Sequence, residues 1–195
     1  MGRVVVTEFI SLDGVIQAPG DPDEFERGGW AQGGGDESMQ FKFEELMASD
    51  AQLLGRTTYE GFARAWPTME GTGAFGDKMN GMPKFVASST LTDPDWANTT
   101  VLEGDLRREV EALKDRYDGD ILVGGSAQLV QSLVEQDLVD ELRLMMFPLV
   151  LGKGKRLFGD TSETKALELV DVRTLEDGVF ILTYRPSQNG SAAPG

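Results

Sequence analysis

Two short apolar runs end in glycine and pass at once into hydroxyl residues, which is a pattern suited to binding phosphate. One run, residues 51–54, leads into Gly55-Arg56-Thr57-Thr58, and the other, residues 121–123, leads into Gly124-Gly125-Ser126-Ala127. Where a strand turns directly into a helix, free backbone N–H groups and the positive end of the helix dipole face the space beyond, and glycine lets an anion come close. The two motifs together predict a ligand with several phosphates.

A third hydroxyl cluster, Ser88-Ser89-Thr90, follows the apolar run 84–87. The carboxyl ends of parallel strands meet at one edge of a sheet, so we expect all three clusters along the same rim. Each also has an ordinary structural explanation, because Thr57 and Glu60 have the spacing of a capping box and Ser126 can cap the next helix. Their coincidence favours a shared ligand. Neither a P-loop nor a G-x-G-x-x-G motif is present, so a dinucleotide must be held in another way.

The composition narrows the chemistry further. The chain has 195 residues, no cysteine, no histidine and a net charge of −15. Disulfides, cysteine-based zinc sites, a histidine base and imidazole ligands are therefore excluded, and we expect no metal site. The negative charge argues against nucleic acid or an anionic membrane as a partner. We find no signal-peptide pattern and no apolar run of membrane-spanning length, so we expect a cytoplasmic protein.

Strand-like and helix-like segments alternate along the chain, which predicts an α/β domain with a largely parallel sheet. The expected strands are residues 4–10, 51–54, 84–87, 100–102, 121–123 and 142–147, of which the last is apolar on both faces and suits a central strand or a dimer seam. Residues 167–175 and 179–184 predict an antiparallel hairpin around Asp177-Gly178, which makes the sheet mixed. We expect a single domain over residues 1–185 and a disordered tail over 186–195.

Helical periodicity predicts helices near residues 39–47, 57–66, 105–117 and 126–134, the first with Met39, Phe43 and Met47 turned inward and the third capped by Asp105. Two glycine-rich stretches, 17–35 and 71–81, are expected as connections. The first contains Trp30, a tryptophan with little packing reason to lie in an exposed loop. We hypothesise that this loop closes over a substrate; the alternative is a mobile surface insertion.

Four motifs in order make the sequence resemble a known family. They are Ser11 to Val15, Leu54 to Glu60, Val123 to Ala127, and Val139 to Leu142 continued by Pro148 to Phe158. Together they resemble the dihydrofolate-reductase-like family, and within it the branch of the C-terminal reductase domain of the bacterial riboflavin-biosynthesis deaminase/reductase. The resemblance covers residues 3–184 and implies a three-layer α/β/α fold, NADPH as coenzyme and a homodimer.

The resemblance also implies roles for the rim residues. The cofactor-binding residues would be Gly55, Arg56, Thr57, Thr58, Ser88, Ser89, Thr90, Val123, Gly124, Gly125, Ser126 and Ala127. Arg56 with Ser88 and Ser89 would face the adenosine 2′-phosphate, and an arginine there favours NADPH over NADH. The substrate-binding residues would be Leu12, Asp13, Gly14, Trp30 and Tyr59.

Asp13 is the catalytic candidate, because it is the one carboxylate in the loop that resembles the family's segment beside the nicotinamide. Burial there would raise its pKa and suit it to donate a proton, whereas the alternative is plain Asp-Gly turn chemistry. A carboxylate on the first helix anchors the pterin in the folate enzymes, and the inward apolar positions expected here argue against dihydrofolate.

We therefore expect a reductase that transfers hydride from NADPH to a small heteroaromatic or carbonyl-bearing substrate. The alternatives are a nucleotide-binding protein of this fold without turnover, and a specialised reductase of the riboflavin pathway.

Overall fold

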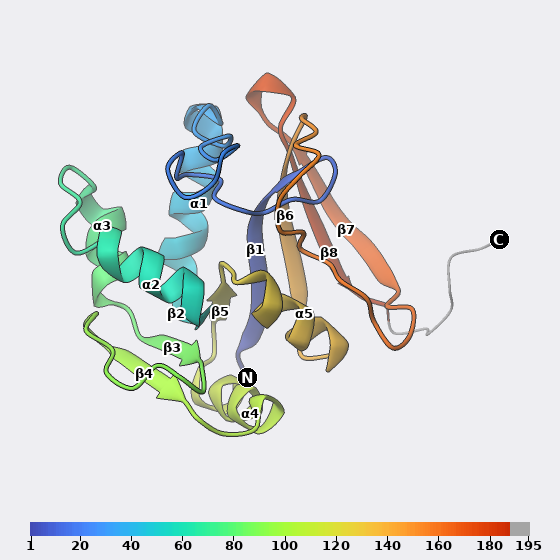
Figure 1. Ribbon diagram of the computed structural model, residues 1–195. Helices are drawn as coiled ribbons and strands as arrows, with labels where there is room; N and C mark the ends of the chain where they lie inside the picture. Colours follow the sequence, from blue (N-terminus) through green and yellow to red (C-terminus); the bar gives the residue numbers. More distant parts are fainter. Residues whose placement is uncertain (188–195) are drawn as a thin grey trace.

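The structure is a computed structural model that describes residues 1–187, and its eight strands form one mixed sheet (Figure 1). The strand order is β4-β3-β2-β5-β1-β6-β8-β7. The strands are β1 (Arg3–Ser11), β2 (Ser49–Gly55), β3 (Lys84–Ala87), β4 (Thr99–Leu102), β5 (Asp120–Val123), β6 (Glu141–Phe147), β7 (Leu167–Thr174) and β8 (Phe180–Pro186). Strands β1 to β6 pair in parallel, and β8 runs antiparallel to both β6 and β7. The predicted fold class is confirmed.

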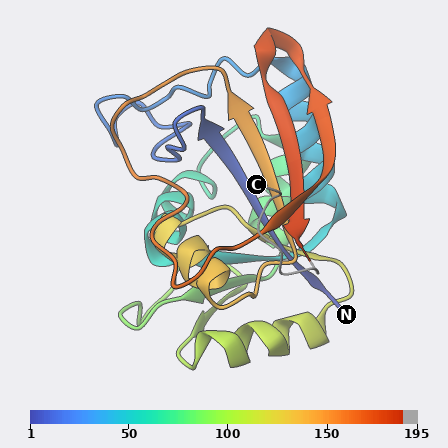
Figure 2. The ribbon, with the colours of Figure 1, turned by 90° about the vertical axis from the view of Figure 1, so that its right-hand side faces the viewer.

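Helices cover both faces of the sheet (Figure 2). Successive side chains of a strand point to opposite faces, and the central strands are apolar on both, so both faces must be covered. On one face Val5 and Leu122 pack with α1 (Gly35–Ala48), α2 (Arg56–Ala65) and α3 (Gly73–Gly81). On the other face Val4, Val6 and Ile121 pack with α4 (Leu106–Arg116) and α5 (Ala127–Glu135). Among the residues described, no helix is both long and apolar enough to cross a bilayer.

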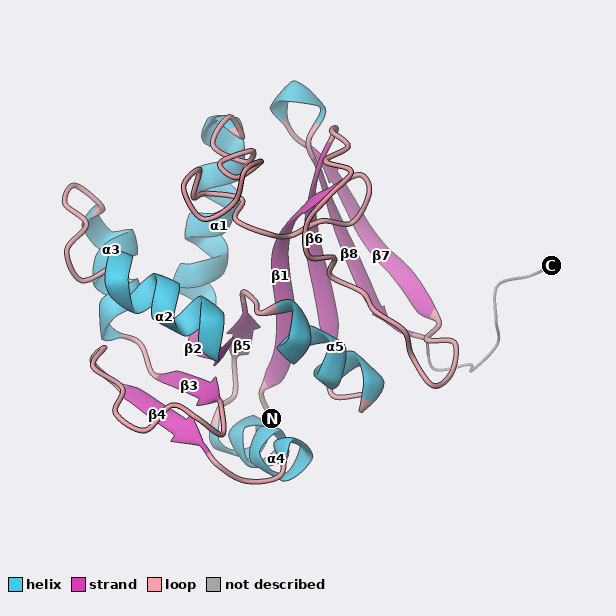
Figure 3. Cartoon of the chain, in the orientation of Figure 1, coloured by secondary structure: helices cyan, strands magenta, loops and turns pink. Residues whose placement is uncertain are grey.

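The carboxyl end of β5 lies where the direction of the chain crossovers reverses. β5 sits between β2 and β1, whose following helices α2 and α1 lie on one face, whereas α5 follows β5 onto the opposite face (Figure 3). In open α/β sheets a crevice forms at such a point, because neighbouring connections leave the rim in opposite directions. The fold therefore opens the rim at the two glycine motifs.

Two expectations about local structure are wrong here. Residues 71–81 are not a plain connection: they contain α3, because Phe75 and Met79, four residues apart, pack into the core beside α2. The capping box of Thr57 and Glu60 does not form, because α2 begins one residue earlier, at Arg56. Glu60 instead accepts a hydrogen bond from Arg56 Nε at 2.6 Å.

The inward face of α1 differs from the prediction in part, because Met47 packs against the core as expected but Met39 does not. Met39 is 60 % exposed, whereas Ser38, Glu45 and Leu46 are buried. Periodicity alone places apolar residues inward, but here the sheet offers a polar partner to Glu45, whose carboxylate meets Arg143 of β6 at 3.3 Å. A buried carboxylate is therefore present on the first helix, near the end of α1 that leads into β2.

The remaining elements follow the prediction closely. Asp105 caps α4 by accepting from the Arg108 N–H, and the β7–β8 hairpin turns through Glu176–Gly178. β6 lies between β1 and β8, as expected for a central strand. The predicted tail begins too early, because Pro186 still belongs to β8 and the Ser187 N–H donates to Ala166 O. Residues 188–195 of that tail lie outside the described residues.

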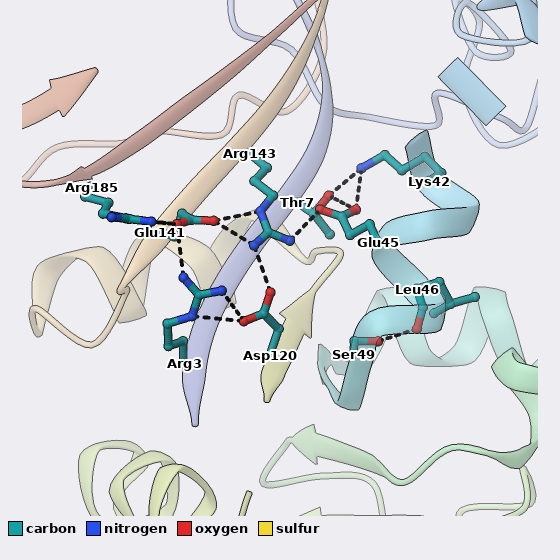
Figure 4. Close-up of polar contacts among 10 residues, drawn as sticks. All are labelled: Arg3, Thr7, Lys42, Glu45, Leu46, Ser49, Asp120, Glu141, Arg143 and Arg185. Carbon is teal, nitrogen blue, oxygen red and sulfur yellow. Dashed lines mark hydrogen bonds and ion pairs between the residues drawn. The ribbon is translucent and has the colours of Figure 1, made fainter. Parts of the chain in front are cut away.

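A charge network ties the strands together at their amino ends (Figure 4). The Arg143 guanidinium meets Asp120 at 2.8 Å and Glu141 at 2.7 Å, in addition to Glu45. Glu141, itself 4 % exposed at its side chain, also pairs with Arg3 and Arg185. The network joins β1, β5, β6, β8 and α1, and among these β5 leads at its opposite end into the Gly124–Ser126 turn at the rim.

Arg143→Met should lower the free energy of unfolding by about 3–5 kcal/mol, because the buried carboxylates of Glu45 and Glu141 and the half-buried one of Asp120 would lose their shared cation. The matched control is Lys153→Met, which removes an exposed pair with Glu26 and should cost less than about 1 kcal/mol. Urea denaturation at pH 7 measures both. Equal small losses would show that the network contributes little to the stability of the sheet.

Candidate functional site

A hollow of about 320 Å³ lies at the carboxyl ends of β2, β3 and β4 and against the start of α5; we call it the rim hollow. Its walls include six of the predicted cofactor residues: Gly55, Arg56, Thr57, Ser88, Ser89 and Ser126. The other wall residues are Ala87, Leu102, Glu103, Gly104, Leu106, Gln128, Leu129 and Ser132. The three hydroxyl clusters therefore share one rim, and Glu103-Gly104 adds a fourth strand end, after β4, that the sequence analysis missed.

Gly55 and Ser126 approach each other so closely that no side chain fits on Gly55. A Cβ on Gly55 would lie 2.2 Å from Ser126 Oγ, and the Gly55 N–H donates to Gly125 O at 3.2 Å. Gly125 itself has φ +99°, a conformation that favours glycine. The glycines are thus required by contact between the two strand ends, and this contact brings the start of α2 beside the start of α5.

Both helix starts have free N–H groups in their first turns. Gly55 and Ser126 occupy the N-cap positions of α2 and α5, and neither provides a side-chain capping bond, so the predicted cap at Ser126 is wrong. Each helix therefore presents unsatisfied donors and the positive end of its dipole toward the rim. Two such ends side by side form a site for an anion with more than one charged group.

Arg56 is held in place at the mouth of the rim hollow. Its guanidinium donates to Glu60 Oε1 and to Thr90 Oγ1, each at 2.6 Å, and its side chain is 48 % exposed. The nearby Ser88 hydroxyl accepts from the Thr90 and Leu91 N–H groups, which fixes the turn after β3. Arg56 thus lies where it was predicted, bonded to Thr90 of the third hydroxyl cluster.

The remaining predicted cofactor residues lie close to the rim hollow but are not on its walls. Val123 is fully buried at the end of β5 and Ala127 is 9 % exposed at the start of α5. Thr58 Oγ1 lies 2.7 Å from the position that a Cβ on Gly125 would take. These residues therefore shape the floor and the turn beneath the rim.

Asp13 does not have the raised pKa that the sequence analysis expected. Its carboxylate accepts from the Ser11 hydroxyl at 2.7 Å and from the Leu151 and Gly152 N–H groups at 3.0 and 2.8 Å. These hydrogen bonds, led by the one from Ser11, lower the pKa of Asp13 to about 2. An ionised carboxylate cannot donate a proton at neutral pH. In this structure Asp13 clamps the segment 148–157 to the end of β1.

Two aromatic candidates are held by the protein itself. Trp30 is half-buried: its ring meets Phe147 edge-on at 5.5 Å and its indole N–H donates to Gln17 O at 2.9 Å. The expectation that it lacks a packing reason is therefore wrong. Tyr59 is 2 % exposed and its hydroxyl accepts from the Trp96 N–H, which places it in the core rather than on the wall of the rim hollow. Leu12, in contrast, is 61 % exposed.

Glu8, in the middle of β1, is a polar residue that the sequence analysis missed. It is 6 % exposed, and its Oε1 has no hydrogen-bond partner within the described chain. Burial raises the pKa of Glu8 to about 8, although Lys42 acts in the opposite direction. Oε1 lies 3.7 Å from the position of a Cβ on Gly125. The available signal was a single carboxylate within the apolar run of residues 4–10.

The sequence profile described as RibD C-terminal domain matches residues 3–181. The chain belongs to this family. The uncharacterised protein YyaP of Bacillus subtilis is 30 % identical over 190 residues, covering 93 % of this chain and 94 % of YyaP. The resemblance drawn from the four motifs is thereby confirmed, and the family is that of a reductase domain.

Solved structures support the same fold. A putative riboflavin biosynthesis protein from Shewanella sp. PV-4 superposes with a TM-score of 0.74 at 20 % identity, covering 95 % of this chain and 99 % of that one. Dihydrofolate reductase from Enterococcus faecalis, solved with NADP(H), superposes with a TM-score of 0.61 at 17 % identity, covering 95 % and 97 %. The chain therefore has the dihydrofolate-reductase-like fold.

Asp13→Ala should speed hydrogen exchange at the Leu151 and Gly152 amides, because both lose their acceptor. Asp160→Ala, at an exposed aspartate of the following segment, is the control and should leave these amides unchanged. Hydrogen exchange followed by NMR measures both variants. In the unmodified protein the protection should persist at pH 4, since the pKa of Asp13 is about 2. Unchanged exchange in Asp13→Ala would contradict the clamp.

Proposed function

We propose that the protein is an NADPH-dependent reductase that transfers hydride to a small heteroaromatic or carbonyl-bearing substrate. The observation that carries this proposal is the meeting of two uncapped helix starts at Gly55 and Ser126, with Arg56 at the mouth of the rim hollow. Membership of a reductase-domain family supports it. The dihydrofolate reductase of the same fold was solved with NADP(H), which supports the choice of coenzyme.

The residues present fit a phosphorylated coenzyme. Because Gly55 has no side chain, the starts of α2 and α5 lie side by side, and their first-turn N–H groups would hold the pyrophosphate. Arg56, with Ser88 and Ser89, would hold the 2′-phosphate. When bound, the nicotinamide supplies the hydride, so the protein needs neither histidine nor metal for the transfer itself.

The protein's own contribution would be to position the substrate and to enclose it away from water. Asp13 fixes the segment 148–157 against β1, and Trp30 packs on Phe147 at the end of β6, so both loops are anchored near the carboxyl ends of the strands. Anchored loops orient a substrate and exclude water without moving a proton themselves. Because Asp13 is ionised, the proton that accompanies hydride would come from another group or from water.

Charge at the rim hollow bears on the choice between NADPH and NADH. Arg56 and Glu103 are the charged side chains among its wall residues, one cation and one anion. A 2′-phosphate can replace Glu60 as the partner of the guanidinium and gain a bidentate charge-assisted contact. NADH offers no such group, so Arg56 discriminates between the two.

The protein should bind NADPH more tightly than NADH, and Arg56→Ala should weaken NADPH binding by roughly 10- to 100-fold while leaving NADH almost unchanged. Arg107→Ala is the control, because Arg107 is an exposed arginine of α4 that is absent from the walls of the rim hollow. Titration followed by coenzyme fluorescence measures the affinity of each of the three proteins for both nucleotides. Equally weak binding of both nucleotides would reject the proposal.

A nucleotide-binding protein without turnover is the second candidate, and the low pKa of Asp13 favours it because the predicted proton donor is lost. Oxidation of NADPH in the presence of candidate pyrimidine and carbonyl compounds separates the two. A ribosylaminopyrimidine phosphate belongs in that set, since the Shewanella neighbour is described as a putative riboflavin biosynthesis protein. Tight coenzyme binding with no oxidation of any compound would support the second candidate.

We also propose that the protein forms a homodimer through β7. β7 is the edge strand of the sheet (Figure 2). All eight of its residues are exposed, and Leu169, Val170 and Val172 are 45–49 % exposed. An open apolar edge can pair with the same edge of a second copy about a two-fold axis. We therefore choose a second copy of this chain as the partner that covers the β7 edge, because no other protein is then needed.

Light scattering should give twice the mass of one chain, and Val172→Lys should shift the protein to the monomer by placing like charges opposite each other. Glu111→Lys, which changes an exposed residue of α4, is the control and should leave the mass unchanged. A monomeric mass for the unmodified protein at high concentration would exclude this interface.

A further inference from the structure

Glu8 places a carboxyl group directly behind the turn that joins β5 to α5. Its Oε1 is 3.7 Å from the Cβ position of Gly125, and the Thr58 hydroxyl lies 2.7 Å from that same position. Gly125 is therefore flanked by one side chain from β1 and one from the first turn of α2. The side chain of Glu8 is more than nine-tenths buried, so this placement is set by packing rather than by solvent.

The carboxyl group is not explained by the fold. Oε1 accepts and donates no hydrogen bond within the described chain. Val6 and Ile10, which share the face of β1 with Glu8, and Leu144, its partner on β6, are apolar. A buried polar group without a partner costs stability, and an apolar side chain of similar size would avoid that cost. Such a group is better explained by a functional role that involves a ligand, which the folded chain alone does not contain.

Burial, more than neighbouring charge, determines the proton state of Glu8. Lys42 of α1 is the charged side chain whose field acts on Glu8, and its ammonium is already engaged by Thr7 and Glu45. The nearest groups of the other two elements, Thr58 and Gly125, are uncharged. Burial therefore dominates and raises the pKa of Glu8 to about 8, so the carboxyl group is neutral at lower pH.

We propose that Glu8 is a positioning residue that links one proton to anion binding at the Gly124–Ser126 turn: the turn accepts an anion while Glu8 is neutral and repels it once Glu8 is ionised. The inference deepens the proposed function and rests on it for the identity of the anion, the pyrophosphate of the coenzyme. A negative charge behind the turn would reduce the positive potential that the starts of α2 and α5 offer to an anion. It would also repel the anion directly, and in a poorly hydrated site that repulsion is only weakly screened.

The linkage has a definite sign. The anion and the ionised carboxylate repel each other, so the anion binds the protonated form of Glu8 more tightly and raises its pKa further. Affinity should therefore be constant below pH 7.5 and fall by up to tenfold per pH unit as the pH rises above about 8. Binding above pH 8 should take up one proton from the buffer.

The experiment compares the unmodified protein with Glu8→Gln, which keeps the shape but cannot ionise. NADPH is titrated from pH 7 to pH 9.5, a range above the second pKa of its 2′-phosphate at about 6, and calorimetry in two buffers counts the protons taken up. We expect the affinity of the unmodified protein to fall at least tenfold across this range and that of Glu8→Gln to stay constant. Glu111→Gln, an exposed glutamate on α4, is the control and should follow the unmodified protein.

Stability gives a second readout that does not involve the coenzyme. The pKa of Glu8 is raised from 4.5 to about 8, so the folded state holds a proton that the unfolded state has lost between those values. The unfolding equilibrium constant of the unmodified protein should therefore rise about tenfold per pH unit from pH 5 to 7.5, relative to Glu8→Gln. Should Glu8→Gln fail to fold, Glu8→Leu serves as the neutral variant with the same expected profiles.

Inorganic pyrophosphate is titrated in parallel, so that the two proposals can fail separately. Parallel NADPH profiles for the unmodified protein and Glu8→Gln would overturn the role of Glu8 and leave the proposed function intact. If NADPH does not bind but pyrophosphate binds with the Glu8-dependent profile, the proposed function fails and the linkage stands. Binding of neither would overturn both.

Discussion

The contact between Gly55 and the Gly125–Ser126 turn is the constraint on which the site depends. A side chain at Gly55 would collide with Ser126, so the two strand ends can meet only as backbone. That meeting places the starts of α2 and α5 side by side although they lie on opposite faces of the sheet. Uncapped N–H groups from both helices then face one rim, and the hydroxyl residues after β3 complete it.

The two ends of the parallel strands have opposite electrostatic characters. At the amino ends, Arg143 and its carboxylate partners pair almost every charge that is buried there. Toward the carboxyl ends, Glu8 Oε1 has no hydrogen-bond partner among residues 1–187, and the first turns of α2 and α5 have no side-chain caps. A paired network favours a fixed framework, whereas unpaired donors and an unpaired acid are typical of a place where a ligand completes the hydrogen bonding.

Asp13 and Glu8 show how environment separates two carboxylates on one strand and its following loop. Asp13 accepts three hydrogen bonds and stays ionised at any neutral pH, so its role is to hold a loop. Glu8 accepts none at Oε1 and is surrounded by apolar residues, so it stays protonated. Two residues of the same chemical type therefore serve different purposes, and the one chosen from the sequence was the wrong one for a neutral acid.

The sequence by itself determined the strand order along the chain, the mixed sheet, the family and the glycine motifs, because these depend on local periodicity and on short patterns that only a turn of one kind can satisfy. The sequence also predicted that Arg56 lies at the rim, because this residue directly follows the end of β2. The tertiary structure alone decided which polar groups are paired: Glu45 with Arg143, Trp30 with Gln17, Asp13 with the segment 148–157. Those partners lie far apart in the chain, and burial and pairing, which set a pKa, are properties of the packed molecule rather than of a residue's neighbours in sequence.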